Sequence, residues 1–430
     1  MHTIIILILA APGLILSFHR PWLGSLWVIG FLLPLIAYDA TEYSMLSRGV
    51  FLFLIFANVL GCIVHKNGLV YCPPLGLAII VSAMAYAVSG VIAISQDISV
   101  LTWFKSTHFF LGIMLYFPIM SEFSSRRRIH HLLTVLVLTT TAMVMTEIYM
   151  TISSGNLFQR YLQLDTTTGF FRSTLYLPTM MILIAAVRYI RSDLLRLALI
   201  LLLCLFLWRL MIGYRRQPLV LLVIGLLLMY YFYALYERKL RALVPFLLSI
   251  MVVSGVFGAL LSIGVIDIQT IVPDGFLRRF DPAVFAAGLE LRFRMIEIAW
   301  SQFMANPIFG AGFGSYIEII VDVERTGGRG LRTVEIEKIH SFYLASLAYG
   351  GLLVSIPIAY LMVNIINLLH RRPLSVNRWS LVMAAFAGSI VMLFLLGIFS
   401  TKLFRLDTWT YIGVVLGMFH ASYQYQFEKT

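Results

Sequence analysis

The chain is a succession of apolar runs separated by short polar turns. A helix needs about 20 mainly apolar residues to cross a bilayer, and we count roughly twelve or thirteen such runs. The first run follows only Met1-His2 and lacks a small-residue cleavage site, so we expect a retained span and not a signal peptide. The pattern predicts an all-α, polytopic membrane protein of about 12–13 transmembrane helices. The runs lie near 3–18, 22–38, 48–64, 74–95, 100–121, 131–152, 173–190, 194–213, 217–236, 243–264, 341–368, 380–401 and 407–424.

One long polar region, between residues 290 and 351, interrupts this pattern. A helix-like segment there stops at Asn306-Pro307, because the residue before a proline avoids the helical region. Glycines follow at 310, 312 and 314, spaced for a turn whose backbone can approach a ligand closely, so Gly312 is a candidate binding position. We expect three parts: an N-terminal transmembrane helix bundle, a loop region with short helices, and C-terminal transmembrane helices, covering 1–264, 265–340 and 341–430.

Composition excludes a large soluble domain. Hydrophobic residues make up 60% of the chain and charged residues 12%, whereas roughly a quarter of the residues of soluble domains are charged. The three cysteines lie in or beside apolar runs without metal-like spacing, so we expect neither a metal site nor a cofactor. A G-x-G-x-G alone is weak evidence for nucleotide binding, and no strand is expected before it, so we reject a Rossmann or P-loop site.

The net charge of +12 is concentrated in short loops that follow alternate spans. This is the positive-inside pattern, which predicts that the basic loops face the cytoplasm and that the region 265–340 faces outward. We therefore ascribe the charge to membrane topology and expect no nucleic-acid partner. The basic clusters are Arg126 to Arg128; Arg188, Arg191 and Arg196; Arg238, Lys239 and Arg241; and Arg371, Arg372 and Arg378.

Some arginines are expected on the outward side, against this rule. Arg215 and Arg216 occupy a very short turn between two apolar spans. One interpretation is that they snorkel into lipid headgroups. The other is an anion clamp, because guanidinium groups bind phosphate oxygens bidentately and stay charged at any relevant pH. The sequence leaves both open.

Helix geometry separates Arg292 from Arg294. Neighbours on a helix surface lie three or four residues apart. Arg294 has Glu290 and Glu297 at these spacings, so we interpret it as structural. Arg292 has no acid at these spacings, which favours an exposed arginine or one that binds an anion; we favour the anion.

His340 is expected at the junction of the outward region and a span. An imidazole has an ordinary pKa of about 6.5, which suits proton transfer at neutral pH. We interpret His340 as a general base; the alternative is a capping or packing residue at a helix start. The preceding stretch carries Arg325, Arg329 and Arg332 among glycines, which is typical of a mobile basic loop that acts either as a lid over an anion site or as a solvated linker.

The order of these motifs resembles a family of bacterial polysaccharide assembly. An arginine turn between two spans is followed by R-x(7)-W, N-P-x-x-G-x-G-x-G, and H-S-x-Y-L-x-x-L-x-x-G-G at the head of a span. This combination is similar to the O-antigen ligase/polymerase superfamily. The stretches HRPWLGSLW, WFKSTHFFLGIML and SSRRRIHHLL resemble its O-glycosylation ligase branch.

The resemblance implies a GT-C-like protein of the bacterial inner membrane with its active site facing the periplasm. Its paired motif residues fall on Arg216, within Arg215-Arg216, and on Arg292 and His340. The family's turn is usually Ser-Arg-Gly, which differs from Arg215-Arg216-Gln217 here. Arg172 stands where the family often has an Asp/Asn-rich stretch. The expected substrate-binding residues are Arg215, Arg172, Arg325, Arg329, Arg332 and Gly312, beside catalytic His340, Arg292 and Arg216.

The implied reaction is metal-independent glycosyl transfer by a protein that is surrounded by membrane lipids. The donor would be an undecaprenyl diphosphate-linked glycan, and the acceptor a hydroxyl group of a glycan, a lipid A-core or a protein. A ligase and a polymerase differ only in acceptor, and the chain leaves that choice open. The competing class is a transporter or flippase for polysaccharide or lipid-linked glycan, which should show internal repeats and charges or broken helices at mid-membrane.

Overall fold

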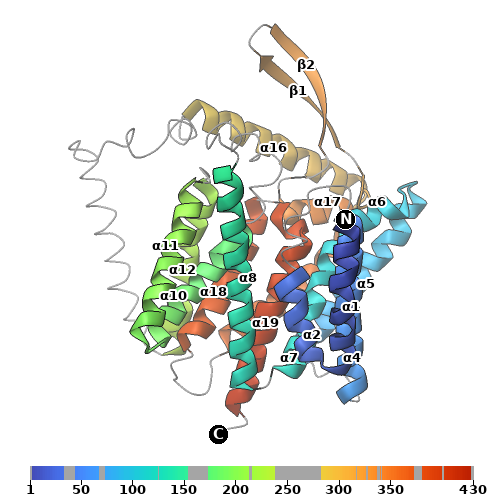
Figure 1. The fold of residues 1–430 in the computed structure, drawn as a ribbon. Coiled ribbons are helices and arrows are strands. Elements are labelled where there is room, and N and C mark those ends of the chain that lie inside the picture. Colours follow the sequence, from blue (N-terminus) through green and yellow to red (C-terminus); the bar gives the residue numbers. More distant parts are fainter. Residues whose placement is uncertain are drawn as a thin grey trace, which may run out of the picture.

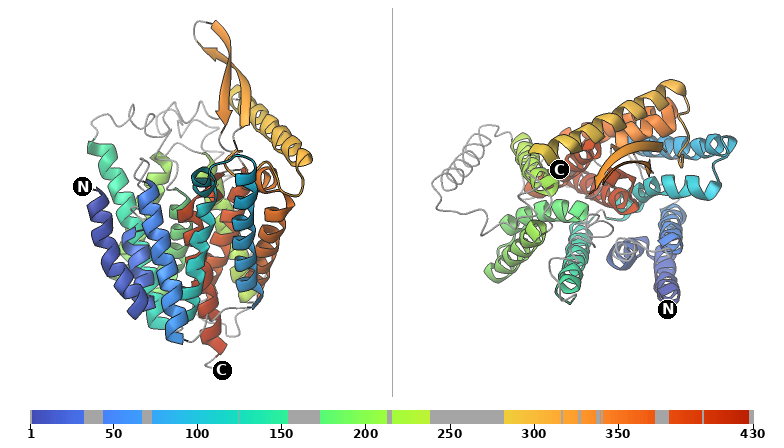
Figure 2. Two further views of the ribbon diagram at one scale, coloured as in Figure 1. Left: turned by 90° about the vertical axis from the view of Figure 1, so that its right-hand side faces the viewer. Right: turned by 90° about the horizontal axis from the view of Figure 1, so that it is seen from above.

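The computed structural model describes residues 2–32, 44–66, 73–123, 125–153, 173–212, 216–237, 282–315, 317–325, 328–336, 339, 341–371, 380–399 and 401–427. These segments form a bundle of helices, one helix lying across an end of the bundle, and a β hairpin (Figure 1). The two further views in Figure 2 show the hairpin projecting away from the helices. The helical class expected from the apolar runs is therefore confirmed, with the hairpin as an addition that the runs did not indicate.

The first half of the chain supplies helices that coincide with the apolar runs. The long run at 100–121 is divided into an α-helix, a 3₁₀ segment and a second α-helix. The elements are α1 (His2–His19), α2 (Pro21–Trp27), the π-helix η1 (Val28–Leu32), α4 (Ser44–Lys66), α5 (Pro73–Ser95), α6 (Val100–Thr107), η2 (His108–Leu115), α7 (Tyr116–Glu122) and α8 (Arg126–Ser153).

The chain from residue 173 onward continues the bundle and adds the crosswise helix and the hairpin. The expected run at 243–264 lies outside the described residues. The elements are α10 (Ser173–Tyr189), α11 (Asp193–Ile212), α12 (Arg216–Tyr236), α16 (Pro282–Ala305), β1 (Ile317–Arg325), β2 (Gly328–Ile336), α17 (Phe342–His370), α18 (Ser380–Phe399), the 3₁₀ helix η6 (Thr401–Phe404) and α19 (Leu406–Phe427).

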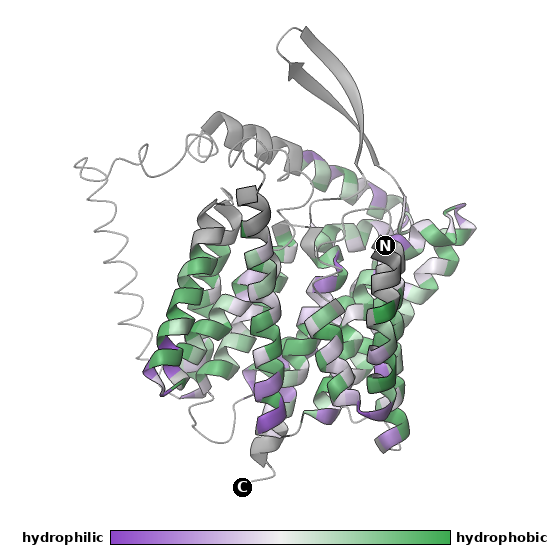
Figure 3. Ribbon diagram, in the orientation of Figure 1, coloured by the Kyte–Doolittle hydropathy of each residue, from purple (hydrophilic) through white to green (hydrophobic). Residues whose placement is uncertain are grey.

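Five of the described helices are long and apolar enough to cross a membrane. They belong to α4, α5, α8, α17 and α18, and shorter apolar helices lie beside them. Apolar residues cover most of the bundle, and polar residues gather toward its two ends (Figure 3). A chain with several such helices is a multi-pass membrane protein, because helices satisfy every backbone group within hydrocarbon.

The centre of the bundle is formed by α18 and α19. The apolar window of α18 is 78% buried, whereas that of α17 is only 33% buried. On α19, Gly413 and Gly417 allow close helix packing, because an added Cβ would lie 2.8 Å from Ile113 O and from Ile119 Cβ, respectively. Small residues four apart commonly permit such approach between membrane helices.

Contacts between distant helices define one end of the bundle. Tyr236, the last residue of α12, donates a hydrogen bond of 2.6 Å to Leu369 O near the end of α17. The Tyr236 and Phe419 rings lie 6.5 Å apart, and His420 hydrogen-bonds the Tyr116 hydroxyl at 2.8 Å. The final turns of α12, α17 and α19 therefore meet. We call this the basic end, because Arg371 caps α17 there and α8 begins there with Arg126 to Arg128 (Figure 1).

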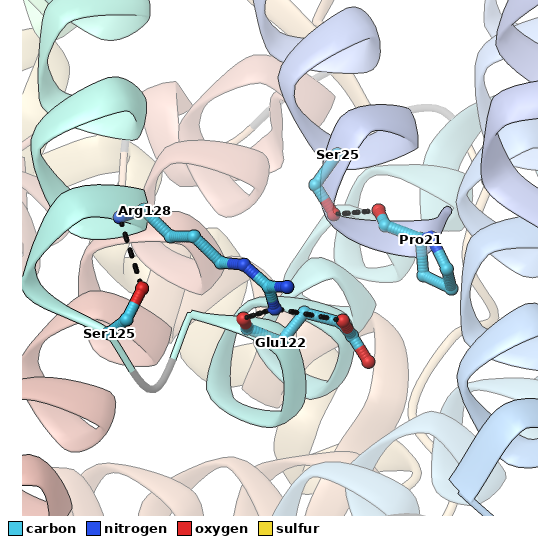
Figure 4. Close-up of polar contacts among 5 residues, drawn as sticks. All are labelled: Pro21, Ser25, Glu122, Ser125 and Arg128. Carbon is cyan, nitrogen blue, oxygen red and sulfur yellow. Dashed lines mark hydrogen bonds and ion pairs between the residues drawn. The ribbon is translucent and has the colours of Figure 1, made fainter.

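Arg128 holds the basic end together (Figure 4). Its guanidinium donates to the Glu122 carbonyl oxygen at 2.6 Å and to Glu122 Oε2 at 3.3 Å. The same group lies 5.2 Å from the Trp22 ring centroid, in the geometry of a cation–π contact. The turn from α1 to α2 thus lies beside the start of α8.

The polar region adopts regular structure at the opposite end. Helix α16 is 24 residues long and lies across the bundle, where the sequence indicated shorter helices (Figure 1). Strands β1 and β2 then form an antiparallel pair in which Ile317 faces Ile336 and Arg325 faces Gly328. The stretch expected as a glycine-rich loop is therefore largely a hairpin.

Candidate functional site

The candidate site is the end of the bundle that carries α16, which we call the α16 end. It consists of α16, the loop 306–315, the first turns of α12 and α17, and η6 with the start of α19. Helix α12 ends at the basic end with Tyr236, so its first residue, Arg216, lies about 30 Å away along the helix axis, toward the α16 end. The start of α12, the stretch from α16 to the start of α17, and η6 with the start of α19 therefore lie at the same end of the bundle.

Helix α17 is interrupted near the α16 end. Gly351 has φ 56° and ψ −156°, a conformation that is essentially restricted to glycine. An added Cβ at this position would lie 2.5 Å from the Ile308 carbonyl oxygen. The Gly350-Gly351 pair of the sequence motif thus marks a break, at which helix carbonyl and amide groups lose their partners within the helix.

The loop 306–315 replaces those partners. Pairing matters here, because an unpaired backbone polar group costs several kcal/mol in hydrocarbon. The asparagine-proline and glycine motif therefore hydrogen-bonds the backbone groups at the break in α17. These bonds also join the loop after α16 to α17. The four bonds are Ala311 N to Ala348 O at 2.8 Å, Gly312 N to Tyr349 O at 3.0 Å, Leu352 N to Pro307 O at 2.9 Å, and Leu353 N to Ile308 O at 3.0 Å.

Gly312 approaches protein atoms closely on the side of its missing side chain. With φ +84°, it would place a Cβ 2.5 Å from Gln96 Oε1 and 2.8 Å from Ile98. The neighbouring Phe313 is buried and packs its ring 5.4 Å from Tyr86 of α5 and 6.1 Å from Tyr349 of α17. The close approach at Gly312 is thus to the bundle itself, and the predicted approach to a ligand is not tested by it. A role of Gly312 in substrate binding stays a prediction.

Helix α16 has a buried face and an exposed face. Met295 and Ala299 are buried, and the helix packs on α17. Arg294 and Glu297 are exposed on another side. By helical spacing, position 292 lies next to both Met295 and the exposed Ile296, at the border of the buried face. The side chain of Arg292 is not described, so its interpretation as an anion-binding residue stays a prediction, as does the structural role of Arg294.

His340 lies outside the described residues, but its chain neighbours are placed. Ile339 and Ser341 are both buried. Ser341 is the N-cap of α17, where its side chain accepts a hydrogen bond of 3.4 Å from Leu344 N. The capping function at this helix start is therefore filled by Ser341. The roles of general base and of packing residue both stay open for His340.

The remaining predicted arginines are divided between described and undescribed segments. Arg172 and Arg215 lie outside the described residues, and Arg216 begins α12. The hairpin carries Arg325 at the end of β1, and Arg329 and Arg332 in β2. In the register, Arg329 faces Glu324 and Arg332 faces Val321. The hairpin adjoins the α16 end, so these positions project from the same side of the molecule (Figure 2).

An ion pair that the sequence analysis did not consider lies beside the start of α17. Arg405 donates from Nε and from a terminal nitrogen to the two oxygens of Asp407, at 2.9 and 3.0 Å. The Asp407 side chain is almost fully buried. The adjacent Phe404 ring lies 5.0 Å from that of Phe342, the first residue of α17. The signal was the R-x-D spacing immediately before an apolar run.

Two other histidines have structural roles. His108 hydrogen-bonds Phe104 O at 2.9 Å, and His420 bonds the Tyr116 hydroxyl, so both are satisfied groups inside the bundle. Within the part of the chain that the structure describes, no three His, Cys, Asp or Glu residues gather closely enough to hold a metal ion.

Comparison with known proteins leaves the family open. No protein-family model matches the chain, and no curated protein matches it. The resemblance to the O-antigen ligase/polymerase superfamily therefore stays a prediction from the motifs.

Proposed function

We propose that the protein is a bacterial inner-membrane glycosyltransferase. It transfers a glycan from undecaprenyl diphosphate to a hydroxyl acceptor on the periplasmic face, as an O-antigen ligase-like enzyme or a polysaccharide polymerase. A lipid diphosphate is an anion at the membrane surface, and arginines bind such oxygens well.

One observation carries this proposal. Helix α12 begins with Arg216, α16 carries position 292, and α17 begins at Phe342, two residues after His340; the starts of α12 and α17 lie at the end of the bundle that carries α16. That end is opposite to the basic end (Figure 1). The positive-inside pattern accounts for the arginines of the basic end, so Arg216 and position 292, on helices at the other end, support an anion site there.

The proposed reaction is a single displacement. The acceptor oxygen attacks the anomeric carbon of the donor, and the bond from that carbon to the diphosphate oxygen breaks. Undecaprenyl diphosphate leaves with the electron pair, and the hydroxyl proton passes to His340. Arg215, Arg216 and Arg292 bind the diphosphate and stabilise the charge that develops on it. One displacement inverts the configuration at the anomeric carbon.

The direct test is turnover by purified protein in nanodiscs with a lipid-linked glycan and a soluble or lipid-linked acceptor. We expect a new glycosidic bond and release of undecaprenyl diphosphate without any membrane gradient. Failure with every acceptor class tested, in protein that still binds the donor, would contradict glycosyl transfer.

The choice between ligase and polymerase is tested in cells. Single uncapped repeats in a deletion strain indicate a lost polymerase, and full-length lipid-linked polymer indicates a lost ligase.

The orientation has its own test. Topology reporters fused after Arg128, Leu240 and Arg372 are expected to report cytoplasm, and one at Gly328 is expected to report periplasm. A cytoplasmic signal at Gly328 would move the α16 end to the wrong side for a periplasmic transferase.

A transporter is the second candidate, because the break in α17 is the kind of feature on which transporters build their sites. Four of the backbone groups around this break, however, are bonded to the loop 306–315. A transport site there would need the loop to leave. Flux across proteoliposomes without glycosyl transfer would favour this candidate.

A further inference from the structure

Helix α16 carries an exposed apolar stripe. Phe293, Ile296, Trp300 and Met304 follow each other at spacings of three and four residues, so they lie on one side of the helix. They are strongly exposed, Phe293 to 62% and Met304 to 60%. The stripe is distinct from the buried face that packs on α17 and from the polar side with Arg294 and Glu297.

The stripe continues onto the outer surface of α17. Ile308 and Phe309 follow α16 in the loop and are both exposed. Ile308 is bonded through its carbonyl oxygen to Leu353 N, so the loop joins α17 at the break. From there, exposed apolar side chains descend α17 at helical spacing: Leu352, Ile356, Tyr360 and Val363. Since α17 has the length and hydropathy of a membrane span, its exposed side faces hydrocarbon.

We propose that the stripe on α16 binds the acyl chains of the membrane leaflet at the α16 end, so that α16 is an interfacial helix of this protein. The continuity of one apolar surface from α17 through Ile308 to α16 identifies the occupant as lipid. The crosswise position of α16 at the end of the bundle agrees with a helix in the plane of the interface (Figure 2). Trp300 has the amphipathic ring that is enriched at this depth. The proposal does not depend on the chemistry of the site.

Spin-label accessibility tests the proposal on the full chain in nanodiscs of phosphatidylethanolamine and phosphatidylglycerol. In a variant without Cys62, Cys72 and Cys204, nitroxides are attached at Met304→Cys and, as the matched control on the polar side, at Ser301→Cys. We expect the ratio of collisions with oxygen to collisions with a water-soluble nickel chelate to be several-fold higher at 304 than at 301. A label at Ile356→Cys gives the value for the deeper hydrocarbon.

Two outcomes would overturn the proposal. Equal access of the chelate to positions 304 and 301 would place the stripe in water. A label at 304 that is immobilised and shielded from both reagents would show that protein, such as a second copy of the chain, covers the stripe.

Trp300 provides an independent measurement in the chain with its cysteines intact. Lipids brominated on the acyl chain near the headgroup should quench the emission of the wild type more than that of Trp300→Phe. The subtraction is needed because the chain has 7 tryptophans. No difference between the two proteins would contradict lipid contact at this residue.

Discussion

The two ends of the bundle are built differently. At the basic end, described arginines are held by neighbours: Arg128 by Glu122 and the Trp22 ring, and Arg196 by Asp193 at 3.2 Å. At the α16 end, four backbone hydrogen bonds join the loop 306–315 to α17 at Gly351, and the rings of Phe313 and Phe404 pack on distant helices beside them. The basic end has the short turns that membrane crossing requires. The α16 end adds a crosswise helix, a helix break that is hydrogen-bonded to a loop, and a hairpin. None of these is needed to cross a bilayer. Side-chain contacts of arginines hold the first end, whereas the backbone hydrogen bonds between the loop 306–315 and α17, the backbone framework, hold the second.

The largest expected effect separates two arginines on one helix. Arg292→Ala is expected to reduce glycosyl transfer below detection, because it removes a proposed diphosphate ligand. Arg294→Ala should keep transfer and cost mainly stability, about 0.2–0.5 kcal/mol for each local acid that loses a partner. The measurement is turnover at matched expression, with donor binding alongside. Equal losses of transfer in both variants would show that the sides of α16 do not differ in function.

The second prediction concerns the base. His340→Ala should lower single-turnover transfer by roughly 10²–10⁴-fold, the range typical of a lost general base. Donor binding should remain, because the arginines and the lipid chain carry that affinity. Transfer by the wild type should also decline on acidification, since a protonated ring cannot accept a proton. Nearly full turnover in the variant would make His340 a packing residue, and lost donor binding would move it into the diphosphate site.

The third prediction tests the backbone framework. Gly351→Ala should lower the free energy of unfolding by about 1–3 kcal/mol from backbone strain alone, with the clash against Ile308 in addition. Gly49→Ala in α4 is the matched control, because no atom lies within 4 Å of its added Cβ; it should be neutral or stabilising by up to ~1 kcal/mol. Thermal unfolding of the purified proteins measures both. Similar midpoints for the two variants would mean that the break does not depend on glycine.

The smallest expected effect lies at the basic end. A double-mutant cycle with Arg128→Met and Glu122→Gln should give a coupling of about 1 kcal/mol, because the carboxylate is nearly buried while the arginine is partly screened by solvent. The exposed pair of Arg196 and Asp193 should give only about 0.2–0.5 kcal/mol. Glycosyl transfer should be unchanged in the variants of either pair. A loss of transfer in the variants of either pair would contradict the proposal that only the α16 end takes part in the reaction.

The sequence predicts the helices well because their signal is local. The expected runs at 74–95 and 380–401 correspond to α5 (Pro73–Ser95) and α18 (Ser380–Phe399). The hairpin was not predicted although part of its signal is in the sequence: Ile317, Ile319, Val321 and Val323 recur at every second position before a glycine turn, which is the period of a strand, and only Ile320 breaks the alternation with polar residues. The glycines and charges of this stretch are equally typical of a loop, which is why the strand period alone does not decide between the two.

The candidate site was predictable only in part, since its geometry depends on distant segments. Helical spacing alone separated Arg292 from Arg294, and position 292 lies at the border of the buried face. No local pattern, however, indicates that the loop after Pro307 inserts at Gly351, since the partner of each backbone group is a tertiary property. The pair of Arg405 and Asp407 is local in the sequence, but its position beside the start of α17 depends on the packing of η6 against that helix, which is a tertiary property.

The break in α17, with its hydrogen bonds to the loop 306–315, also constrains the order of events during synthesis. The loop 306–315 leaves the ribosome before α17, so the groups that bond Ala348 and Leu352 already exist when the second half of that helix emerges. Until the loop reaches the bilayer edge, a break in hydrocarbon would leave several backbone groups unpaired. Lateral release of α17 from the insertion channel is therefore expected to wait for α16 to settle on the membrane. Helix α16, which lies across the bundle in the finished protein, would thus first position the loop that pairs the backbone groups of α17 as that span enters the bilayer.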